Sequence, residues 1–216
     1  MSIHATMHIV SPSRRDAYFD WLQMLTGLGL VIFIALHTAL NLSIIFGAKS
    51  LDIVAGALEA LHLDTLAHVF VPVLFLVHFV LAARKIPFRV DGQLAIWRDA
   101  RLLNHRDTWL WIVQTISGMV ILILGAIHMW TTITAGAVQA ASSVARVQSS
   151  GWTMFYLLLI PLVQGHVFIG LYRIGVKWGV ITDKMRPKVV KILVITFVCV
   201  LILALLALAR YATLTI

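Results

Sequence analysis

Five histidines lie in long apolar stretches of this sequence, where imidazole is the side chain best suited to bind a metal. His37, His68, His78, His128 and His166 all fall in segments that contain no Asp, Glu, Lys or Arg. Ionisable groups within a membrane are costly and commonly functional. Neutral imidazole binds metal ions, and it binds haem iron from a helix without a charged neighbour. An interhelical hydrogen bond would explain a single such histidine, but five favour a metal or haem site.

The elements that carry these histidines are predicted to be transmembrane helices. The 216 residues are 61% hydrophobic and 12% charged, with a mean hydropathy of +0.96, whereas about a quarter of the residues in a soluble domain are charged. The charge-free stretches match the ~20 helical residues that cross a bilayer. We predict an all-α integral membrane protein, a single domain over 1–216, with five transmembrane helices at approximately 21–46, 65–84, 108–133, 152–173 and 190–211.

The basic residues indicate the orientation of these spans. Of the 17 Lys and Arg, 14 lie before the first span or in the connections 84–107 and 173–191, which all fall on one side of the membrane. The positive-inside rule therefore places the N-terminus in the cytoplasm. Because the cations alternate with the spans, they argue against a nucleic-acid partner.

The connections between the spans carry weaker signals. Helical spacing of apolar residues predicts short amphipathic helices within 47–64 and 84–107. Residues 1–20 are predicted to be a polar lead-in, with a short interfacial helix from Arg15. The lone Cys199 lies inside the last apolar run, where we expect it to be buried in the core.

Depth along the helices sorts the histidines into two layers. Counted from the cytoplasmic end of each span at ~1.5 Å per residue, His37 lies ~26 Å along its helix and His128 ~32 Å, whereas His78 lies ~9 Å and His166 ~10 Å. This predicts two bis-histidine sites, His37 with His128 and His78 with His166, as needed for two b haems stacked across the membrane. His68, at ~24 Å, is the competing ligand in the outer layer.

Haem propionates require cations or hydrogen-bond donors near each membrane surface. On the inner side Gln23, Trp111 and Lys177 are available, and on the outer side Arg146 and Tyr156. The sequence contains no Cys-x-x-Cys-His motif, which excludes covalent attachment of a c-type haem.

The whole pattern resembles the single-chain dihaem cytochrome b anchor of quinol:fumarate reductases and succinate:quinone oxidoreductases. In that family the first four of five helices form the dihaem-binding bundle, which implies that His37 and His128 hold the distal haem and His78 and His166 the proximal one. The five propionate candidates named above also match the family by their offsets from the ligands. Glu59, 22 residues after His37, matches an acidic residue implicated in menaquinol oxidation.

The resemblance also implies partner subunits and a cellular location. The chain would anchor a fumarate reductase or succinate dehydrogenase complex of anaerobic respiration in the bacterial cytoplasmic membrane and exchange electrons with menaquinol or menaquinone. It would have no fumarate-reducing site, because the sequence lacks a Gly-rich dinucleotide motif and a Cys cluster. FAD and iron–sulfur clusters would belong to a flavoprotein and an iron–sulfur subunit docked on the basic cytoplasmic face, in a possible dimer of heterotrimers.

One departure and two alternatives accompany this interpretation. Some family members have a carboxylate two residues before the fourth ligand, proposed to carry protons, whereas this chain has Gln164, which does not titrate.

The alternatives are the haem-b anchor of a hydrogenase or formate dehydrogenase, and a non-redox transporter. The first usually places two ligands on one helix, and the second usually needs charged midplane residues or internal repeats.

Overall fold

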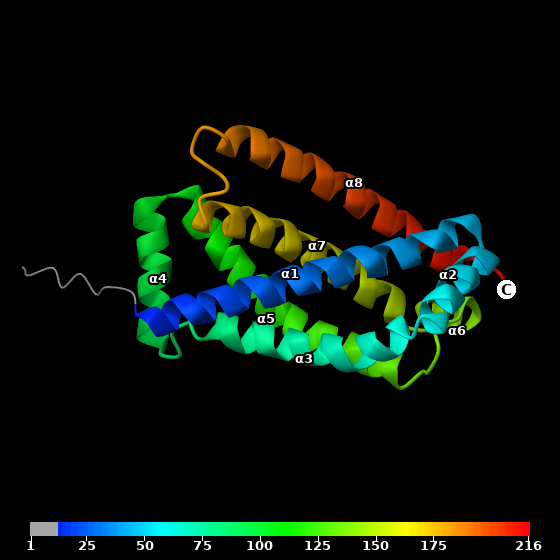
Figure 1. The fold of residues 1–216 in the computed structure, drawn as a ribbon. Helices are drawn as coiled ribbons and strands as arrows, with labels where there is room; N and C mark the ends of the chain where they lie inside the picture. The colour runs from blue at the N-terminus through cyan, green and yellow to red at the C-terminus, as the bar shows by residue number, and fades with distance from the viewer. Residues whose placement is uncertain (1–12) are drawn as a thin grey trace, which may run out of the picture.

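A computed structural model describes residues 13–216, and this part of the chain is helical without any strand (Figure 1). The predicted lead-in falls largely on residues 1–12, which lie outside the described residues. The elements are α1 (Arg14–Leu42), the 3₁₀ helix η1 (Ser43–Phe46), α2 (Ala48–Ala60), α3 (Leu63–Ala83), α4 (Val90–Leu103), α5 (Arg106–Ile133), α6 (Ala140–Gln148), α7 (Trp152–Lys177) and α8 (Arg186–Thr213).

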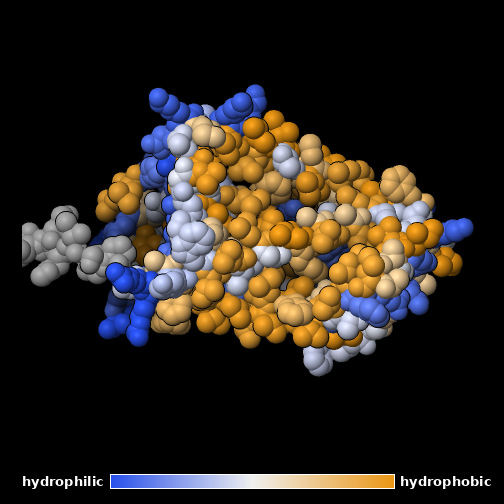
Figure 2. All heavy atoms as spheres, in the orientation of Figure 1, coloured by the Kyte–Doolittle hydropathy of each residue, from blue (hydrophilic) through white to orange (hydrophobic). Residues whose placement is uncertain are grey.

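Five of these elements are long and apolar enough to cross a membrane: α1 with η1, α3, α5, α7 and α8. Their middle portions expose many large apolar side chains, and Figure 2 shows a broad hydrophobic surface between two more polar ends. Such a surface is stable when lipid surrounds it. The prediction of an all-α membrane protein with five spanning helices is therefore confirmed.

Helices α1, α3, α5 and α7 pair along their length, and α8 packs outside them against α7 and α1 (Figure 1). Helix α1 contacts α3, and α5 contacts α7. Glycine allows a close approach in the first pair, because a Cβ on Gly29 would lie 3.0 Å from Leu74 Cδ2. The histidine-bearing helices thus lie together, as a shared binding site requires.

The two ends of the bundle are built differently. Helix α4 crosses the end at which α1 begins, and α2 and α6 lie at the opposite end with the C-terminus (Figure 1). We call these the inner and outer ends, after the predicted orientation. The most deeply buried apolar cluster is at the outer end, where Ile44 and Leu51 pack with Val144, Val147 and Tyr211.

The structure corrects two expectations from the sequence. There is no separate interfacial helix at Arg15, because α1 runs without interruption from Arg14; the Ser13 hydroxyl caps it by accepting the Asp16 N–H at 3.1 Å. Cys199 is exposed on α8 rather than buried in a core. It belongs to the broad apolar surface that α8 turns away from the other helices.

Candidate functional site

The outer layer brings two of the predicted ligands into contact. The rings of His37 on α1 and His128 on α5 have centroids 5.9 Å apart. The Tyr156 hydroxyl lies 3.4 Å from Nδ1 of His128. Among the described residues it is therefore His37, and not His68 on α3, whose ring lies against that of His128.

Asn41 is a neighbour of this layer that the sequence analysis missed. Its amide Nδ2 lies 3.3 Å from Nε2 of His37 and donates to the His37 carbonyl at 2.8 Å. The Tyr211 hydroxyl donates to the Asn41 side-chain oxygen at 3.1 Å, which links α8 to the site. A metal bound at Nε2 of His37 would replace the contact with the Asn41 amide.

The inner layer fixes the protonation of His78 through its second ring nitrogen. Nδ1 of His78 lies 3.1 Å from the Thr26 hydroxyl and 3.2 Å from the Gln23 backbone carbonyl. A carbonyl can only accept, so these contacts place the proton on Nδ1. Nε2 then keeps its lone pair, which is the form that binds a metal.

His166 on α7 is held in the same way by α5. Its Nδ1 lies 3.0 Å from the Ser117 hydroxyl, which donates to the Gln114 carbonyl at 3.1 Å. The hydroxyl oxygen is thereby left to accept from Nδ1, and Nε2 of His166 makes no hydrogen bond with a described residue.

Glycines form the surface on which these two rings rest. A Cβ added to Gly27 would lie 2.9 Å from Cε1 of His78, and one added to Gly118 would lie 3.1 Å from Cε1 of His166. The described residues contain no group of three or more His, Cys, Asp or Glu that could hold a metal ion. Pairs of oriented imidazoles in glycine-lined grooves fit instead a haem held by two axial ligands.

The inner contacts reveal an internal similarity between α1 and α5. Gln, a hydroxyl residue, Gly and an outer histidine recur at the same spacing, as Gln23, Thr26, Gly27 and His37 in α1 and as Gln114, Ser117, Gly118 and His128 in α5. Each helix therefore supports the inner histidine of its neighbour and carries an outer histidine of its own. This repeat is the signal in the sequence that could have found Thr26 and Ser117.

The inner end gathers an excess of positive charge. Lys177, a predicted propionate partner, pairs with Asp20, which also binds Arg84 and Lys85, the latter at 2.6 Å. Burial lowers the pKa of Lys85, and its contact with Asp20 opposes this effect. Buried donors on Arg84 and Trp178 have no hydrogen-bond partner among the described residues. One carboxylate does not balance three cations, and the buried donors also need an acceptor. An additional anionic group could therefore bind at this end.

The other two predicted partners of the inner haem propionates, Gln23 and Trp111, have weaker support in the structure. Gln23 presents its backbone carbonyl to His78. Trp111 lies two turns before Gly118 on the same face of α5. Sequence analysis missed Arg173, which lies seven residues after His166 on the same face of α7, is partly buried, and makes no ion pair with a described residue.

The two predicted outer partners are linked to His128, Tyr156 directly and Arg146 through Thr132. Tyr156 contacts its ring, as described above. Arg146 on α6 donates to the Thr132 hydroxyl at 3.5 Å, and that hydroxyl donates to the His128 carbonyl at 2.8 Å. A cation and a phenol therefore stand beside the outer histidine pair.

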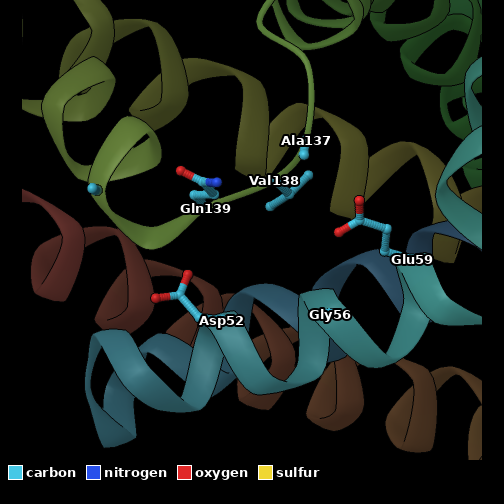
Figure 3. A pocket seen from close by; sticks show the side chains of 7 residues that line it. Asp52, Gly56, Glu59, Ala137, Val138 and Gln139 are labelled. Atoms are coloured by element: carbon cyan, nitrogen blue, oxygen red, sulfur yellow. The ribbon is translucent and has the colours of Figure 1, made fainter.

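Glu59 lines a cavity at the outer end, between α2 and residues 137–141 (Figure 3). The cavity has a volume of about 290 Å³, and Asp52, Gly56 and Gln139 also line it. Figure 3 shows the Glu59 carboxylate directed from α2 toward the facing segment. That segment connects α5, which carries His128, to α6, which carries Arg146.

The fold and the site define a helical membrane protein with two pairs of histidines inside its bundle. Comparison with known proteins shows that the chain belongs to the succinate dehydrogenase/fumarate reductase transmembrane subunit family, which residues 91–207 match. It is 30% identical to a fumarate reductase cytochrome b subunit of Wolinella succinogenes over 213 residues, which cover 92% of this chain and 83% of the relative. A relative with the same name from Helicobacter pylori is 30% identical over 76% of this chain and 68% of its own. The succinate dehydrogenase cytochrome b558 subunit of Bacillus subtilis is 25% identical over 81% of this chain and 86% of its own. The resemblance stated from the sequence is thereby confirmed, and the transporter and hydrogenase alternatives are not supported.

Proposed function

We propose that this chain is the dihaem cytochrome b subunit of a membrane-bound fumarate reductase or succinate dehydrogenase. The observation that carries the proposal is the pair of inner histidines whose Nδ1 atoms are occupied by Thr26 and Ser117, together with the outer pair in ring contact. The names of the relatives from three organisms support the same conclusion.

Each proposed haem b has two protein ligands, His78 with His166 in the inner layer and His37 with His128 in the outer one. The haem irons would supply reversible one-electron transfer across the bundle. The chain itself orients the imidazoles, keeps Nε2 of the inner pair unprotonated, and excludes water with apolar helix faces.

The propionates are proposed to meet the basic groups near each end. Gln23, Trp111 and Lys177 serve the inner haem and Arg146 and Tyr156 the outer one. The surplus of cations around Asp20 supports the inner assignment. The contacts of Arg146 and Tyr156 around His128 support the outer one.

Glu59 is proposed as the proton acceptor for menaquinol at the outer cavity. Oxidation of a quinol releases protons, so a base must stand within hydrogen-bond reach of a quinol hydroxyl. The Glu59 carboxylate makes no hydrogen bond or ion pair with a described residue and lines the cavity, which leaves it free for a substrate. The same carboxylate would return a proton during quinone reduction.

The soluble partners are proposed to dock at the inner end, which would face the cytoplasm of a bacterial cell. Helix α4 crosses this end (Figure 1), and its residues Trp97, Arg98 and Arg101 are exposed. An iron–sulfur subunit bound there would exchange electrons with the inner haem and with a flavoprotein subunit that carries FAD. The intact assembly is proposed as a dimer of such heterotrimers.

Substitution of the histidines tests the haem assignment. We expect His78→Ala or His166→Ala to remove the inner haem and His37→Ala or His128→Ala to remove the outer one, measured as haem per complex and as the reduced b-type bands. His68→Ala is the matched control and should keep both haems. Full haem content in any of the four ligand variants would remove that residue from the ligand set, and a loss in His68→Ala would move the outer assignment to His68.

Glu59→Gln tests the quinol assignment in the intact complex. The variant should keep both haems and should reduce fumarate from an artificial donor that reaches the soluble subunits directly, yet lose turnover driven by menaquinol. Asp64→Asn, a second acid at the outer end, is the control and should turn over normally. Normal quinol turnover in Glu59→Gln would refute the role of Glu59.

A further inference from the structure

The outer cavity has a second carboxylate at the end opposite Glu59. Asp52, Gly56 and Glu59 are spaced by four and three residues and so share one face of α2. Asp52 and Glu59 are seven residues apart, which is about 10.5 Å along the helix. Figure 3 shows both carboxylates directed from α2 toward the facing segment, with Gly56 between them.

The space between the two acids is open, and small or apolar residues line its middle. A Cβ added to Gly56 would meet no atom within 4 Å, so the glycine leaves bare backbone as the floor. Ala137 and Val138 form the facing wall. A ligand with an apolar middle and a hydrogen-bond donor at each end fits this lining.

We propose that Asp52 is the second proton-accepting group of the quinol site, so that one para-quinol ring is held between Asp52 and Glu59. This inference rests on the proposed oxidation of quinol at the outer end. The rise of about 10.5 Å is measured along the helix axis between the two residues, and a para-quinol whose hydroxyls each donate a hydrogen bond of about 2.7 Å is short enough to lie between them.

Two acceptors match the stoichiometry of the reaction. Oxidation breaks both O–H bonds of the quinol, and one proton passes to Glu59 and the other to Asp52. The two electrons leave one at a time to ferric haem b, the one-electron oxidant of the proposed function. The products are the quinone, two protonated carboxyl groups and two transferred electrons. A single base would have to release its first proton before it could accept the second.

Asp52 also has a structural contact, which makes the proposal testable. Its Oδ1 accepts the backbone N–H of Ala140 at 2.7 Å and so joins α2 to the start of α6. The second oxygen, Oδ2, has no partner among the described residues. Asparagine can keep the bond to Ala140 through its side-chain oxygen, but it cannot accept a proton. Asp52→Asn therefore separates the two roles.

The test compares Asp52→Asn with wild type in the complete complex, with a water-soluble naphthoquinol as the probe. We expect quinol-driven fumarate reduction to fall at least tenfold in kcat, the pH profile of quinol oxidation to change, and both haems and the rate from the artificial donor to be retained. Asp52→Asn with wild-type kcat, KM and pH profile would overturn the proposal and leave Asp52 a structural residue.

Two further variants keep the test decisive. Gly56→Leu fills the floor of the cavity without altering either carboxylate and should raise KM for the naphthoquinol severalfold, whereas an unchanged KM would show that the ring lies elsewhere. Glu59→Gln distinguishes the two proposals. If Glu59→Gln is inactive with quinol and Asp52→Asn is normal, only the role of Asp52 fails; if both are normal, the quinol site itself is misplaced.

Discussion

Gly27→Ala should weaken binding of the inner haem while leaving the helix that carries it intact. The new Cβ would lie 2.9 Å from Cε1 of His78, and the ring would have to move ~0.5 Å to reach an ordinary contact of 3.4 Å. The ring can only move away from α1, so the 3.1 Å contact between Nδ1 and the Thr26 hydroxyl would lengthen to about 3.6 Å, beyond hydrogen-bond range. Loss of such a supporting contact typically costs 10–100-fold in metal affinity, about 1.4–2.8 kcal/mol.

Gly165→Ala is the matched control, because Gly165 precedes His166 in α7 and an added Cβ there meets no atom within 4 Å. Replacing a helical glycine favours the helix by about 0.5–1 kcal/mol in both variants, so this gain cancels in the comparison. The assay is haem per purified complex together with a redox titration of the inner b-type band. Full inner haem with an unchanged midpoint potential in Gly27→Ala would refute the assignment of this groove to His78 and its haem.

Three other changes probe the inner end. Ser117→Ala should lower inner-haem affinity roughly tenfold by removing the acceptor for Nδ1 of His166; haem titration of the purified protein measures this, and unchanged affinity would contradict it. Arg173→Leu removes a cation ~10 Å along the helix from His166 and should lower the inner midpoint potential by on the order of 70 mV; a potentiometric titration in which the midpoint stays fixed would count against this role. Charge reversal at Arg98 and Arg101 should release the soluble subunits and keep both haems; their co-purification at ordinary salt would assign these cations to lipid and topology alone.

The spanning helices were predictable because a bilayer imposes a length that composition alone reveals. Their ends were less so. Helix α1 begins at Arg14 rather than near residue 21, since the charged residues before Trp21 continue the helix beyond the apolar segment and Ser13 caps it. Helix α6 was not predicted at all, because its 9 residues are too few for a helix that is stable on its own, and its start is tied to Asp52 on another helix.

The histidine layers were predictable from depth, but the supporting residues were not. A count of ~1.5 Å per residue pairs His37 with His128, whose rings are in contact. Such a count gives depth but not the rotation of each helix about its own axis. That rotation determines whether Thr26 and Ser117 face the inner histidines. Asp20 escaped notice for the same reason: its three cations come from the ends of α3 and α7, which only the tertiary fold brings together.

The distribution of acids gives the proposed reaction an electrical consequence. The nine Asp and Glu lie near the helix ends or in connections, and the position two residues before His166 is the buried, non-titrating Gln164. Protons released at the outer cavity then have no carboxylate path through the bundle, while the electrons travel inward. Each quinol moves two negative charges across the membrane, and an opposing potential of 100 mV costs about 4.6 kcal/mol per quinol.

In liposomes containing the complete complex, quinol-driven fumarate reduction should produce a signal from a voltage-sensitive dye and should accelerate when an ionophore dissipates the potential. Turnover without either response would show that protons accompany the electrons by a route other than carboxylate side chains.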